Sequence, residues 1–415
     1  MATRVEELDL LKSELPANPT YDEFIAENTR QRTHNWLVKN SLGYGIVTYE
    51  DAVAFLRNPS LHQAGNFSSP NFKGKASAFD ENGEYNGLGF YDGEEHHRLK
   101  RLMSPTFSAK SIDNLRPQMS QHIQDVVEKV HSSIDSVSFE FQEAFKPYPL
   151  SMICILLDIP SFNWDLFNRW VDAIPLRWLS SVEEQEYLDT TSDFLAYLRE
   201  LIEDRKMNLG DDLLSSLIKT EDDGDKLSTN ELIGLVLALS YAGVATMRNQ
   251  LGMLIAQVAE RPDLLQTLKK DPSLIRDTVE ESLRFQNTLR IQSRIVVEEF
   301  EYKDVIFSPG QIITISSASA NHDETKFANP DDFDIFRDSV ANHLSLGSGV
   351  HYCLGAFLAR AELQEALKVF INNWSSISID GEIEWMHLRS PTWGPVSIPL
   401  HVVRDSSFIH QLWYT

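Results

Sequence analysis

The stretch HLSLGSGVHYCLG, residues 343–355, holds one of the two cysteines of the chain and leads into a strongly helical run that extends to Phe370. Gly347 and Gly349 lack a Cβ, so the backbone there can adopt positive φ angles and lie flat against a planar group. Cys353 stands where the helix begins, and unpaired N–H groups and the positive end of the helix dipole favour a thiolate at such a position. The stretch therefore predicts a cysteine that acts as a metal ligand or as a nucleophile.

Cys353 has competing interpretations. A lone cysteine is most often a small buried hydrophobic residue, but His351 before it and Gly355 after it favour a functional one. A tetrahedral zinc site would need a second cysteine or a close histidine pair nearby, and neither is present. A nucleophile would need a partner base, which the sequence alone does not identify. One thiolate at a helix start, with room for a flat cofactor, suits a haem iron.

These residues carry a family resemblance. The stretch resembles the haem-binding signature of cytochrome P450, F-G-x-G-x-H-x-C-x-G, with Leu346 in place of the phenylalanine. The resemblance implies that Cys353 is the proximal iron ligand, whose thiolate pushes electron density to the iron and favours O–O cleavage. It also implies that the loop glycines Gly347, Gly349 and Gly355 cradle haem b and that His351 reaches a haem propionate. The likeness extends from about residue 36 to residue 403.

Length and composition set the fold class that we expect. The chain has 415 residues, two cysteines and 42% apolar residues, without a linker or repeat. We therefore expect one domain over residues 1–415, which the resemblance makes mainly α-helical with small β-sheets. Strands are expected near 36–38, 46–48, 299–316 and 376–404. Cys154 lies in an apolar run and is interpreted as a core residue.

Charge and hydropathy limit the partners. The net charge of −24 argues against nucleic acid, because binding phosphates needs a basic surface. The N-terminus has no apolar signal segment, and no uninterrupted apolar run reaches the ~20 residues that span a bilayer. We therefore expect a soluble, cytoplasmic, monomeric protein of bacterial type.

The segment 92–107 resembles the D-P-P-E-H-x-x-x-R segment of the family. His96 and Lys100 then occupy its histidine and arginine positions, four residues apart on one helix face, and would bind the haem propionates. His97 and Arg101 share this spacing, so a register shifted by one residue stays open. The family receives electrons singly from a ferredoxin-like partner served by an NAD(P)H-dependent reductase. The same basic cluster, together with Lys110, is our candidate docking patch for that partner.

A long buried helix is expected to follow residue 228. Ser228 and Glu231 form a capping box, and the nearly continuous apolar residues after it indicate burial on all sides. Its middle, residues 242–246, resembles the oxygen-binding segment A-G-x-[DE]-T of the family. The small residues Ala242 and Gly243 would leave room for oxygen above the iron. Thr246 would present its hydroxyl there or bond back to the carbonyl four residues earlier.

Ala245 departs from this pattern. The family has an acid at its position, which helps to relay the protons that break the O–O bond. The alanine is compatible with simple drift and with altered chemistry. Several reactions therefore stay open: hydroxylation, oxidative phenol coupling, a peroxide-driven reaction, or a haem-binding protein that no longer activates oxygen. Thr246 argues against the last of these.

Two further motifs match in order. Glu281 and Arg284 form E-x-x-R about seventy residues before the cysteine. The resemblance implies a buried structural ion pair, which we expect Arg337 to join. Arg294 occupies the position of a propionate-binding arginine, and a guanidinium fork suits a carboxylate. Arg290 is interpreted as a surface charge, with a substrate-carboxylate ligand as the alternative.

The substrate-contacting segments of the family fall on residues 61–89, 162–188, 289–291 and 391–396. Within them we expect four residues to line the pocket: Leu289, Ile291, Thr392 and Trp393. Most of the tryptophans Trp164, Trp170 and Trp178 are interpreted as packing residues. Taken together, the sequence predicts a haem-thiolate oxidoreductase acting on a small, largely apolar or aromatic molecule.

Overall fold

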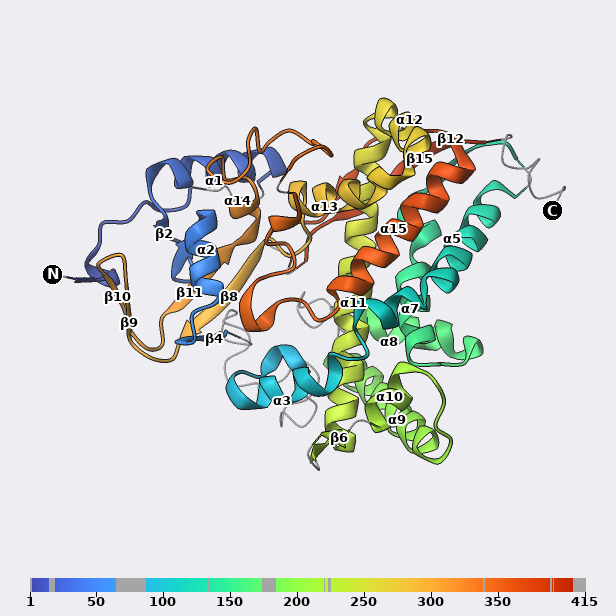
Figure 1. Cartoon of the computed structure of the whole chain (residues 1–415), viewed down its shortest axis with the longest axis horizontal. Helices are drawn as coiled ribbons and strands as arrows, with labels where there is room; N and C mark the ends of the chain where they lie inside the picture. The colour runs from blue at the N-terminus through green and yellow to red at the C-terminus, as the bar shows by residue number, and fades with distance from the viewer. Residues whose placement is uncertain are drawn as a thin grey trace.

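Helix α11 forms the central axis of the molecule (Figure 1). It covers Thr229–Ala259, 31 residues, which at 1.5 Å per residue is about 47 Å. The Ser228 hydroxyl accepts the Glu231 N–H at 3.2 Å, and the Glu231 carboxylate accepts the Ser228 N–H at 2.7 Å. The predicted capping box is therefore confirmed.

This computed structural model describes residues 2–14, 19–64, 87–132, 134–173, 184–219, 221–222, 225–338, 340–388, 390 and 392–405.

Within the described part of the chain, α11 alone has the length and hydropathy of a membrane-spanning helix. Half of its most apolar window is buried inside the protein, and α11 contacts α7, α9, α13 and α15. Its polar residues Asn249 and Gln250 are also buried and hydrogen-bonded. These are the properties of a core helix.

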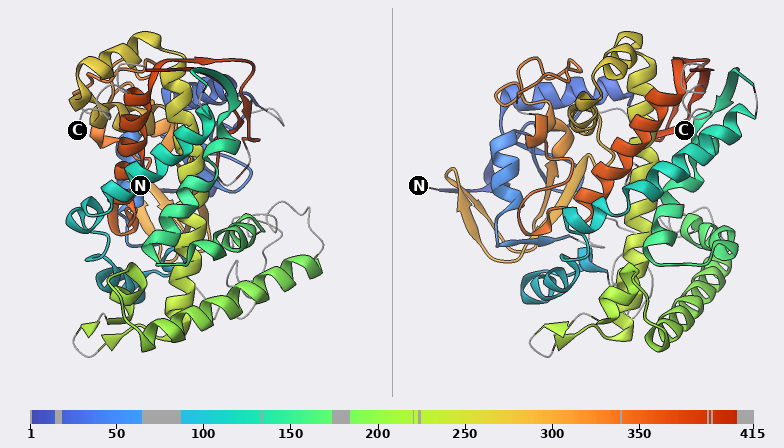
Figure 2. Two further views of the ribbon diagram at one scale, coloured as in Figure 1. Left: turned by 90° about the vertical axis from the view of Figure 1, so that its right-hand side faces the viewer. Right: turned by 45° about the vertical axis from the view of Figure 1, so that its right-hand side comes forward.

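Most helices pack around α11 on one side of the molecule, as Figure 2 shows from two directions. Cys154, on α7, is completely buried in this core, as predicted. The larger helices of this group are α5 (Arg116–His131), α7 (Pro147–Leu156), α8 (Trp164–Ala173), α9 (Glu184–Met207), α10 (Leu213–Lys219), α12 (Pro262–Lys270), α13 (Ile275–Phe285) and α15 (Ala356–Asn373).

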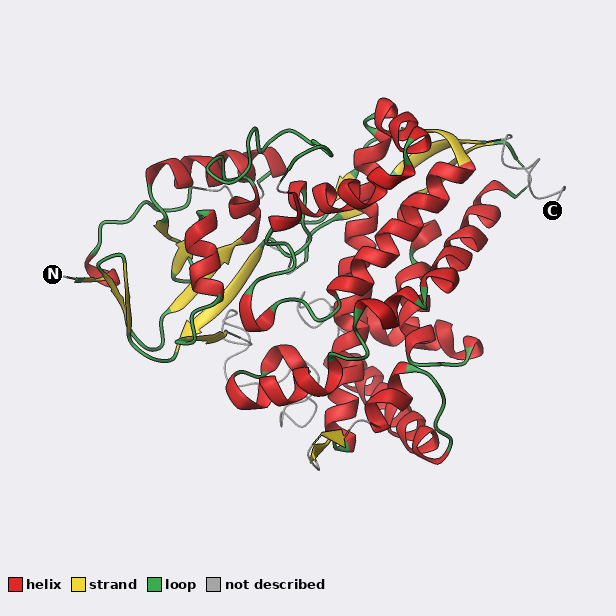
Figure 3. Cartoon of the chain, in the orientation of Figure 1, coloured by secondary structure: helices red, strands yellow, loops and turns green. Residues whose placement is uncertain are grey.

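The largest sheet lies on the opposite side from these helices (Figure 3). Its strand order is β2-β3-β11-β8-β4, with only β3 and β11 parallel. The strands are β2 (Leu37–Lys39), β3 (Tyr44–Ile46), β4 (Leu61–Gln63), β8 (Ile291–Val296) and β11 (Ile312–Ser316). The predicted strand at 46–48 lies two residues earlier, because Thr48 is already the N-cap of the next helix.

Shorter elements complete the fold. The helices are α1 (Tyr21–His34), α2 (Tyr49–Leu56), α3 (Gly93–Met103), α4 (Ala109–Asp113), α6 (Phe141–Phe145) and α14 (Ser317–Asn321). The remaining strands are β1 (Thr3–Arg4), β5 (Ser136–Glu140), β6 (Glu221–Asp222), β7 (Asp225–Lys226), β9 (Phe300–Tyr302), β10 (Val305–Phe307), β12 (Trp374–Ile379), β13 (Glu384–Trp385), β14 (Pro395–Ser397) and β15 (Pro399–Arg404). The strands expected within 299–316 and 376–404 are therefore confirmed.

Candidate functional site

The loop before α15 connects the sheet with the helices around Cys353. The Cys353 N–H donates to the Leu346 carbonyl at 2.9 Å and closes the loop. Gly347 and Gly349 have φ angles of +75° and +73°, which confirms the predicted need for glycine. A Cβ on Gly349 would lie 2.8 Å from the carbonyl oxygen of Leu56, so a larger residue cannot enter without moving α2.

Cys353 is exposed as a residue, although its sulfur is turned towards the protein, and it forms no disulfide. Close surroundings desolvate its sulfur and raise its pKa, while the Gly355 N–H and the charges of Arg360 and Lys100 act in the opposite direction. Helix α15 begins three residues later, at Ala356. An iron bound to the sulfur would stabilise its thiolate form.

No group of three or more His, Cys, Asp or Glu side chains that could hold a metal ion exists among the described residues. A site built on Cys353 therefore offers at most two such protein ligands among the described residues. Zinc in a structural site takes four protein ligands, whereas one axial thiolate is sufficient for haem iron, which the porphyrin already coordinates.

Helix α3 places His96 and Lys100 on one face, as expected from their spacing. His96 is buried, its Nδ1 has no hydrogen-bond partner among the described residues, and its ring centroid lies 4.2 Å from that of His351. Burial, with a smaller effect from the charges of His351 and Lys100, lowers the pKa of His96 to about 4. The Lys100 ammonium donates to the carbonyls of Val350 and Tyr352, so it braces the cysteine loop directly.

Arg294, on β8, is buried without a complete set of partners. Its Nη1 donates to the Gln63 side chain at 2.8 Å, but Nη2 has no partner among the residues described. Burial lowers its pKa to about 10, while the charge of Asp92 opposes that shift. His351 Nε2 lies 2.8 Å from the Asp92 carboxylate. The sequence analysis did not single out Gln63 and Asp92; Asp92 does stand at the aspartate of the D-P-P-E-H pattern.

Haem b fits this donor set. Buried donors without partners are rare in folded proteins and call for an explanation, and a propionate would satisfy Arg294 Nη2. The glycines of the cysteine loop leave its backbone bare for a flat ring. The buried His96 adds a second polar atom without a partner.

One face of α11 differs from the rest of that helix. Ala242 is exposed, and Gly243, Ala245 and Thr246 are half-buried, although residues 232–237 and 249–259 are buried throughout. The Thr246 hydroxyl donates to the Ala242 carbonyl, which confirms the predicted bond to the preceding turn. Because its hydrogen is used in this way, the Thr246 oxygen remains free to accept a hydrogen bond.

Gly243 has a different contact from the one expected. A Cβ at this position would lie 2.7 Å from Cδ1 of Ile153 on α7. The glycine therefore allows α7 to pack closely against α11, and the space for oxygen predicted at Gly243 is occupied by Ile153. Ala242 is the residue whose small side chain faces open space.

The E-x-x-R pair is buried, as the resemblance implied. Arg284 Nε lies 2.7 Å from Glu281, and both side chains are completely inaccessible. The Arg284 guanidinium also donates to the carbonyls of Asn321, Pro330 and Asp332. Arg337 joins the pair, with its Nε 3.5 Å from Glu281. This network ties α13 to the chain that leads into the cysteine loop.

A second buried carboxylate escaped the sequence analysis. Glu280 accepts from Arg360 at 2.6 and 2.9 Å and from His343 at 3.2 Å, and Arg360 also donates to the Tyr352 hydroxyl at 3.0 Å. The pair Glu280 and Arg360 is separated by eighty residues, so no local spacing could have indicated it.

The predicted pocket residues divide into two groups. Leu289 and Ile291 are 40% and 46% exposed, and Thr392 is half-buried. Trp393 is 1% exposed, with ring centroids of Tyr21 and Trp385 stacked at 4.6 and 4.7 Å. The prediction that Trp393 lines the pocket is therefore wrong, because both of its faces are already covered.

Arg290 is also placed differently from the first interpretation. It is 5% exposed and not a surface charge. Burial lowers its pKa to about 10, while Tyr21 acts in the opposite direction. No carboxylate among the described residues forms an ion pair with it.

Two tryptophans of the expected lid segment pack internally. Trp164 donates to the Ile159 carbonyl at 2.9 Å, and Trp170 stacks on Phe194 at 5.1 Å. Trp178 lies outside the described residues, as do residues 65–86 of the first pocket segment.

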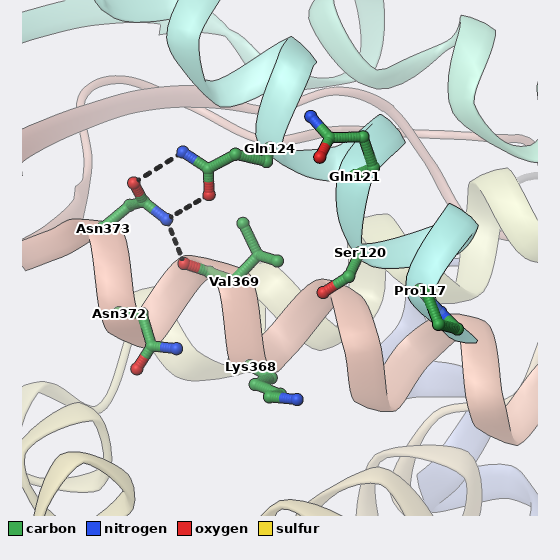
Figure 4. Close-up of a pocket in the computed structure, with 8 residues that line it drawn as sticks. All are labelled: Pro117, Ser120, Gln121, Gln124, Lys368, Val369, Asn372 and Asn373. Carbon is green, nitrogen blue, oxygen red and sulfur yellow. Dashed lines mark hydrogen bonds between the residues drawn. The ribbon is translucent and has the colours of Figure 1, made fainter. Parts of the chain in front are cut away.

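A surface hollow of about 250 Å³ lies between α5 and α15, where Gln124 and Asn373 bond each other (Figure 4). None of the residues that line it belongs to the site around Cys353.

Comparisons with known proteins agree on one family. The family model described as cytochrome P450 matches residues 44–393. A mycinamicin IV hydroxylase/epoxidase of Micromonospora griseorubida is 31% identical over 373 residues, 86% of this chain and 88% of that protein. The polyketide biosynthesis cytochrome P450 PksS of Bacillus subtilis is 32% identical over 319 residues, 74% and 76% of the two chains. The solved structure of CxnD, a cytochrome P450 for C–S bond formation in chuangxinmycin biosynthesis, superposes with a TM-score of 0.79 at 26% identity, covering 94% and 97%.

Proposed function

This chain belongs to the cytochrome P450 family, and we propose that it is a haem-thiolate monooxygenase that uses Cys353 to oxidise a bulky, largely apolar natural product. The family makes it an oxidoreductase with haem b as its cofactor. Two observations carry the proposal: Cys353 is exposed and in no disulfide, and the buried Arg294 has an Nη2 without a partner among the described residues.

Bound haem supplies the redox chemistry by which dioxygen is activated with two electrons and two protons. Cys353 would hold the iron, while Arg294, His96, His351 and Lys100 hold the propionate side or brace the loop. His351 would brace the cysteine loop through its bond to Asp92. The Glu281–Arg284–Arg337 network would have a structural role, since Glu281 and Arg284 are completely inaccessible and Arg284 also donates to three backbone carbonyls.

On α11, the chain contributes space and one acceptor. The small side chain of Ala242 leaves space on the exposed face of the helix. Thr246 holds its oxygen towards that face because its own hydrogen is bonded to the Ala242 carbonyl. A water that donates one hydrogen to Thr246 would be held there with its second hydrogen free, and we propose that such a water supplies protons in place of the acid that is missing at Ala245.

The substrate class follows from the relatives and from the pocket residues. The two relatives act on mycinamicin IV and in polyketide biosynthesis. Leu289 and Ile291 offer exposed apolar surface, which suits a large apolar ligand that brings its own hydroxyl groups. We therefore propose a polyketide-derived substrate that is hydroxylated or epoxidised.

The test uses the reconstituted enzyme with a ferredoxin, its reductase, NAD(P)H and isotope-labelled dioxygen, screened first with macrolactones by the spin-state shift of the haem. One labelled oxygen atom in the product is expected. Reductant consumption without any product from ligands that shift the spin state would contradict the monooxygenase assignment. Product formed only with added hydrogen peroxide would assign the peroxide-driven reaction instead.

A second candidate is oxidative coupling, which Ala245 favours. Removing a hydrogen atom from each of two substrate positions inserts no oxygen: both atoms of dioxygen leave as water, with two electrons from the reductase and two protons that a polar substrate would help to supply in place of the acid missing at Ala245. CxnD, which serves C–S bond formation, has the same fold. An oxidised product that carries no labelled oxygen would favour this candidate.

We further propose that the chain works as a single-domain, cytoplasmic monomer that receives electrons one at a time. The exposed side chains His97 and Lys110 lie in the middle of α3 and on α4. They are the candidate contacts for a ferredoxin, close to Lys100 and hence to the cysteine loop.

A further inference from the structure

Leu289 and Ile291 belong to a segment that is fixed at both ends. Before them, the Thr288 hydroxyl accepts from Asn249 on α11 at 3.3 Å, three residues after Thr246. After them, Gln292 reaches Gly347 of the cysteine loop, where a Cβ would lie 3.5 Å from the glutamine oxygen. The two exposed side chains therefore border the space between the Thr246 turn of α11 and the cysteine loop.

Arg290 projects from the same segment in the opposite direction, as the alternation of extended backbone requires. Its guanidinium carbon lies 5.2 Å from the ring centroid of Phe24 on α1 and 5.5 Å from that of Trp393. One guanidinium nitrogen donates to the Leu388 carbonyl. A desolvated guanidinium between two aromatic rings is strongly held, because no water competes for its charge.

Trp393 joins the same segment to the β13–β14 hairpin. Its backbone N–H donates to the Thr288 carbonyl at 2.9 Å, and its indole N–H donates to the Met386 carbonyl at 3.1 Å. Its ring is stacked between Tyr21 of α1 and Trp385 of β13. Helix α1, the hairpin and the segment at 288–291 thus meet in one aromatic cluster around Arg290.

We propose that Arg290 is a positioning residue for substrate selection: its clamp between Phe24 and Trp393 fixes Leu289 and Ile291, backed by the β13–β14 hairpin, as one rigid wall of the ligand space. This inference rests on the proposed function and adds the device that sets the shape of the site. The ligands that depend on it would be bulky and apolar, because only a large ligand would contact both the site at Cys353 and the exposed side chains of Leu289 and Ile291. The affinity of a ligand that needs only the iron would not depend on the clamp.

The test compares Arg290→Met, Arg290→Lys and the matched control Arg261→Met in the haem-loaded enzyme. Arg261 also lies over two aromatic rings, Phe285 and Phe333, at 5.7 and 4.8 Å, but its side chain is 32% exposed and paired with Glu260, so it controls for removing an arginine from an aromatic contact outside residues 288–291. The probes are imidazole, which needs only the iron, and clotrimazole, a bulky triaryl azole. We expect Arg290→Met to weaken clotrimazole about tenfold without affecting imidazole, Arg290→Lys to recover part of the loss, and Arg261→Met to change neither.

Amide hydrogen exchange over residues 384–397 tests the clamp without relying on haem. Exchange there should accelerate in Arg290→Met and not in Arg261→Met. Unchanged exchange, or an equal loss of imidazole and clotrimazole binding, would overturn the inference. A wild-type protein that binds neither azole would overturn the proposed function instead, and the exchange result alone would then decide the clamp.

Discussion

Glu280 shows how one buried residue couples stability to pH. Burial alone would raise the pKa of its carboxyl, but hydrogen bonds from His343 and Arg360 outweigh it and lower the pKa to about 2. A carboxylate with a lowered folded-state pKa contributes stability that is present above its ordinary pKa. That contribution is lost as the pH falls towards about 2.

We therefore expect Glu280→Gln to lower the free energy of unfolding near neutral pH by about 3 kcal/mol and to flatten its dependence on pH in the acid range. Urea unfolding at a series of pH values measures both effects. Glu299→Gln is the control, because its ion pair with Arg4 is half-exposed and such pairs contribute little. A Glu280→Gln protein with an unchanged acid profile would show that the carboxylate is not the stabilising group.

Ala245 gives a residue-scale prediction about chemistry. It is half-buried on the face that also carries Ala242 and Thr246, so Ala245→Asp would place a carboxyl where the family has one. We expect the ratio of product formed to NAD(P)H consumed to rise severalfold if the missing acid limits hydroxylation. An unchanged ratio, with haem content equal to the wild type, would mean that water or substrate already supplies the protons.

At the scale of elements, Gly394 allows the β13–β14 hairpin to pack closely against α11. A Cβ on Gly394 would lie 2.5 Å from Cβ and 3.0 Å from Cα of Asn249, so the hairpin would have to move away from the helix. We expect Gly394→Ala to destabilise the protein by about 1–3 kcal/mol, the usual cost of overpacking.

Thermal unfolding of Gly394→Ala and of the control Gly89→Ala separates this clash from a general effect of losing glycine. A Cβ on Gly89 would meet nothing within 4 Å. The control should therefore retain the wild-type Tm. Equal Tm values for Gly394→Ala and the wild type would contradict the close approach of hairpin and helix.

The elements differ in how well they can be predicted from the sequence. Helix α11 was predictable from Ser228 onwards because a capping box and an unbroken apolar run are local signals. Glu281 and Arg284 were predictable because they are three residues apart on one helix face. The pairing of Glu280 with Arg360 was not, because it joins residues eighty positions apart.

The errors have the same origin. Trp393 and Arg290 were assigned from their place in a segment, whereas their burial depends on Tyr21 and Phe24 near the other end of the chain. Gly243 was interpreted as open space because it is small; its small size instead admits Ile153 of α7. Local pattern predicts an element and its face, but not which distant side chain covers that face.

At the scale of the whole molecule, the net charge of −24 opposes an acidic electron donor while the basic residues near α3 and α4 attract it. The two effects have different ranges. The Debye length is about 30 Å at 0.01 M salt, about 10 Å at 0.1 M and about 3 Å at 1 M. Moderate salt should therefore screen the repulsion of the whole body before it weakens the local contacts.

We expect the rate of reduction by a ferredoxin to pass through a maximum near 0.1 M ionic strength. The Debye length there is about 10 Å, which screens the distant charges of the protein but not the direct contacts. Stopped-flow reduction at several salt concentrations measures it. Lys110→Glu should remove the maximum, because the exposed Lys110 would then add to the repulsion. A rate that rises steadily with salt in the wild type would argue against a basic docking patch.

The central claim is that Cys353 is the axial ligand of a haem, and the carbon monoxide difference spectrum of the reduced protein tests it most directly. The wild type should show the red-shifted Soret band that thiolate-bound ferrous haem gives, and Cys353→His should lose that band while Cys154→Ser keeps it. A wild-type band typical of imidazole or neutral thiol ligation, or a protein that takes up no haem, would contradict the account.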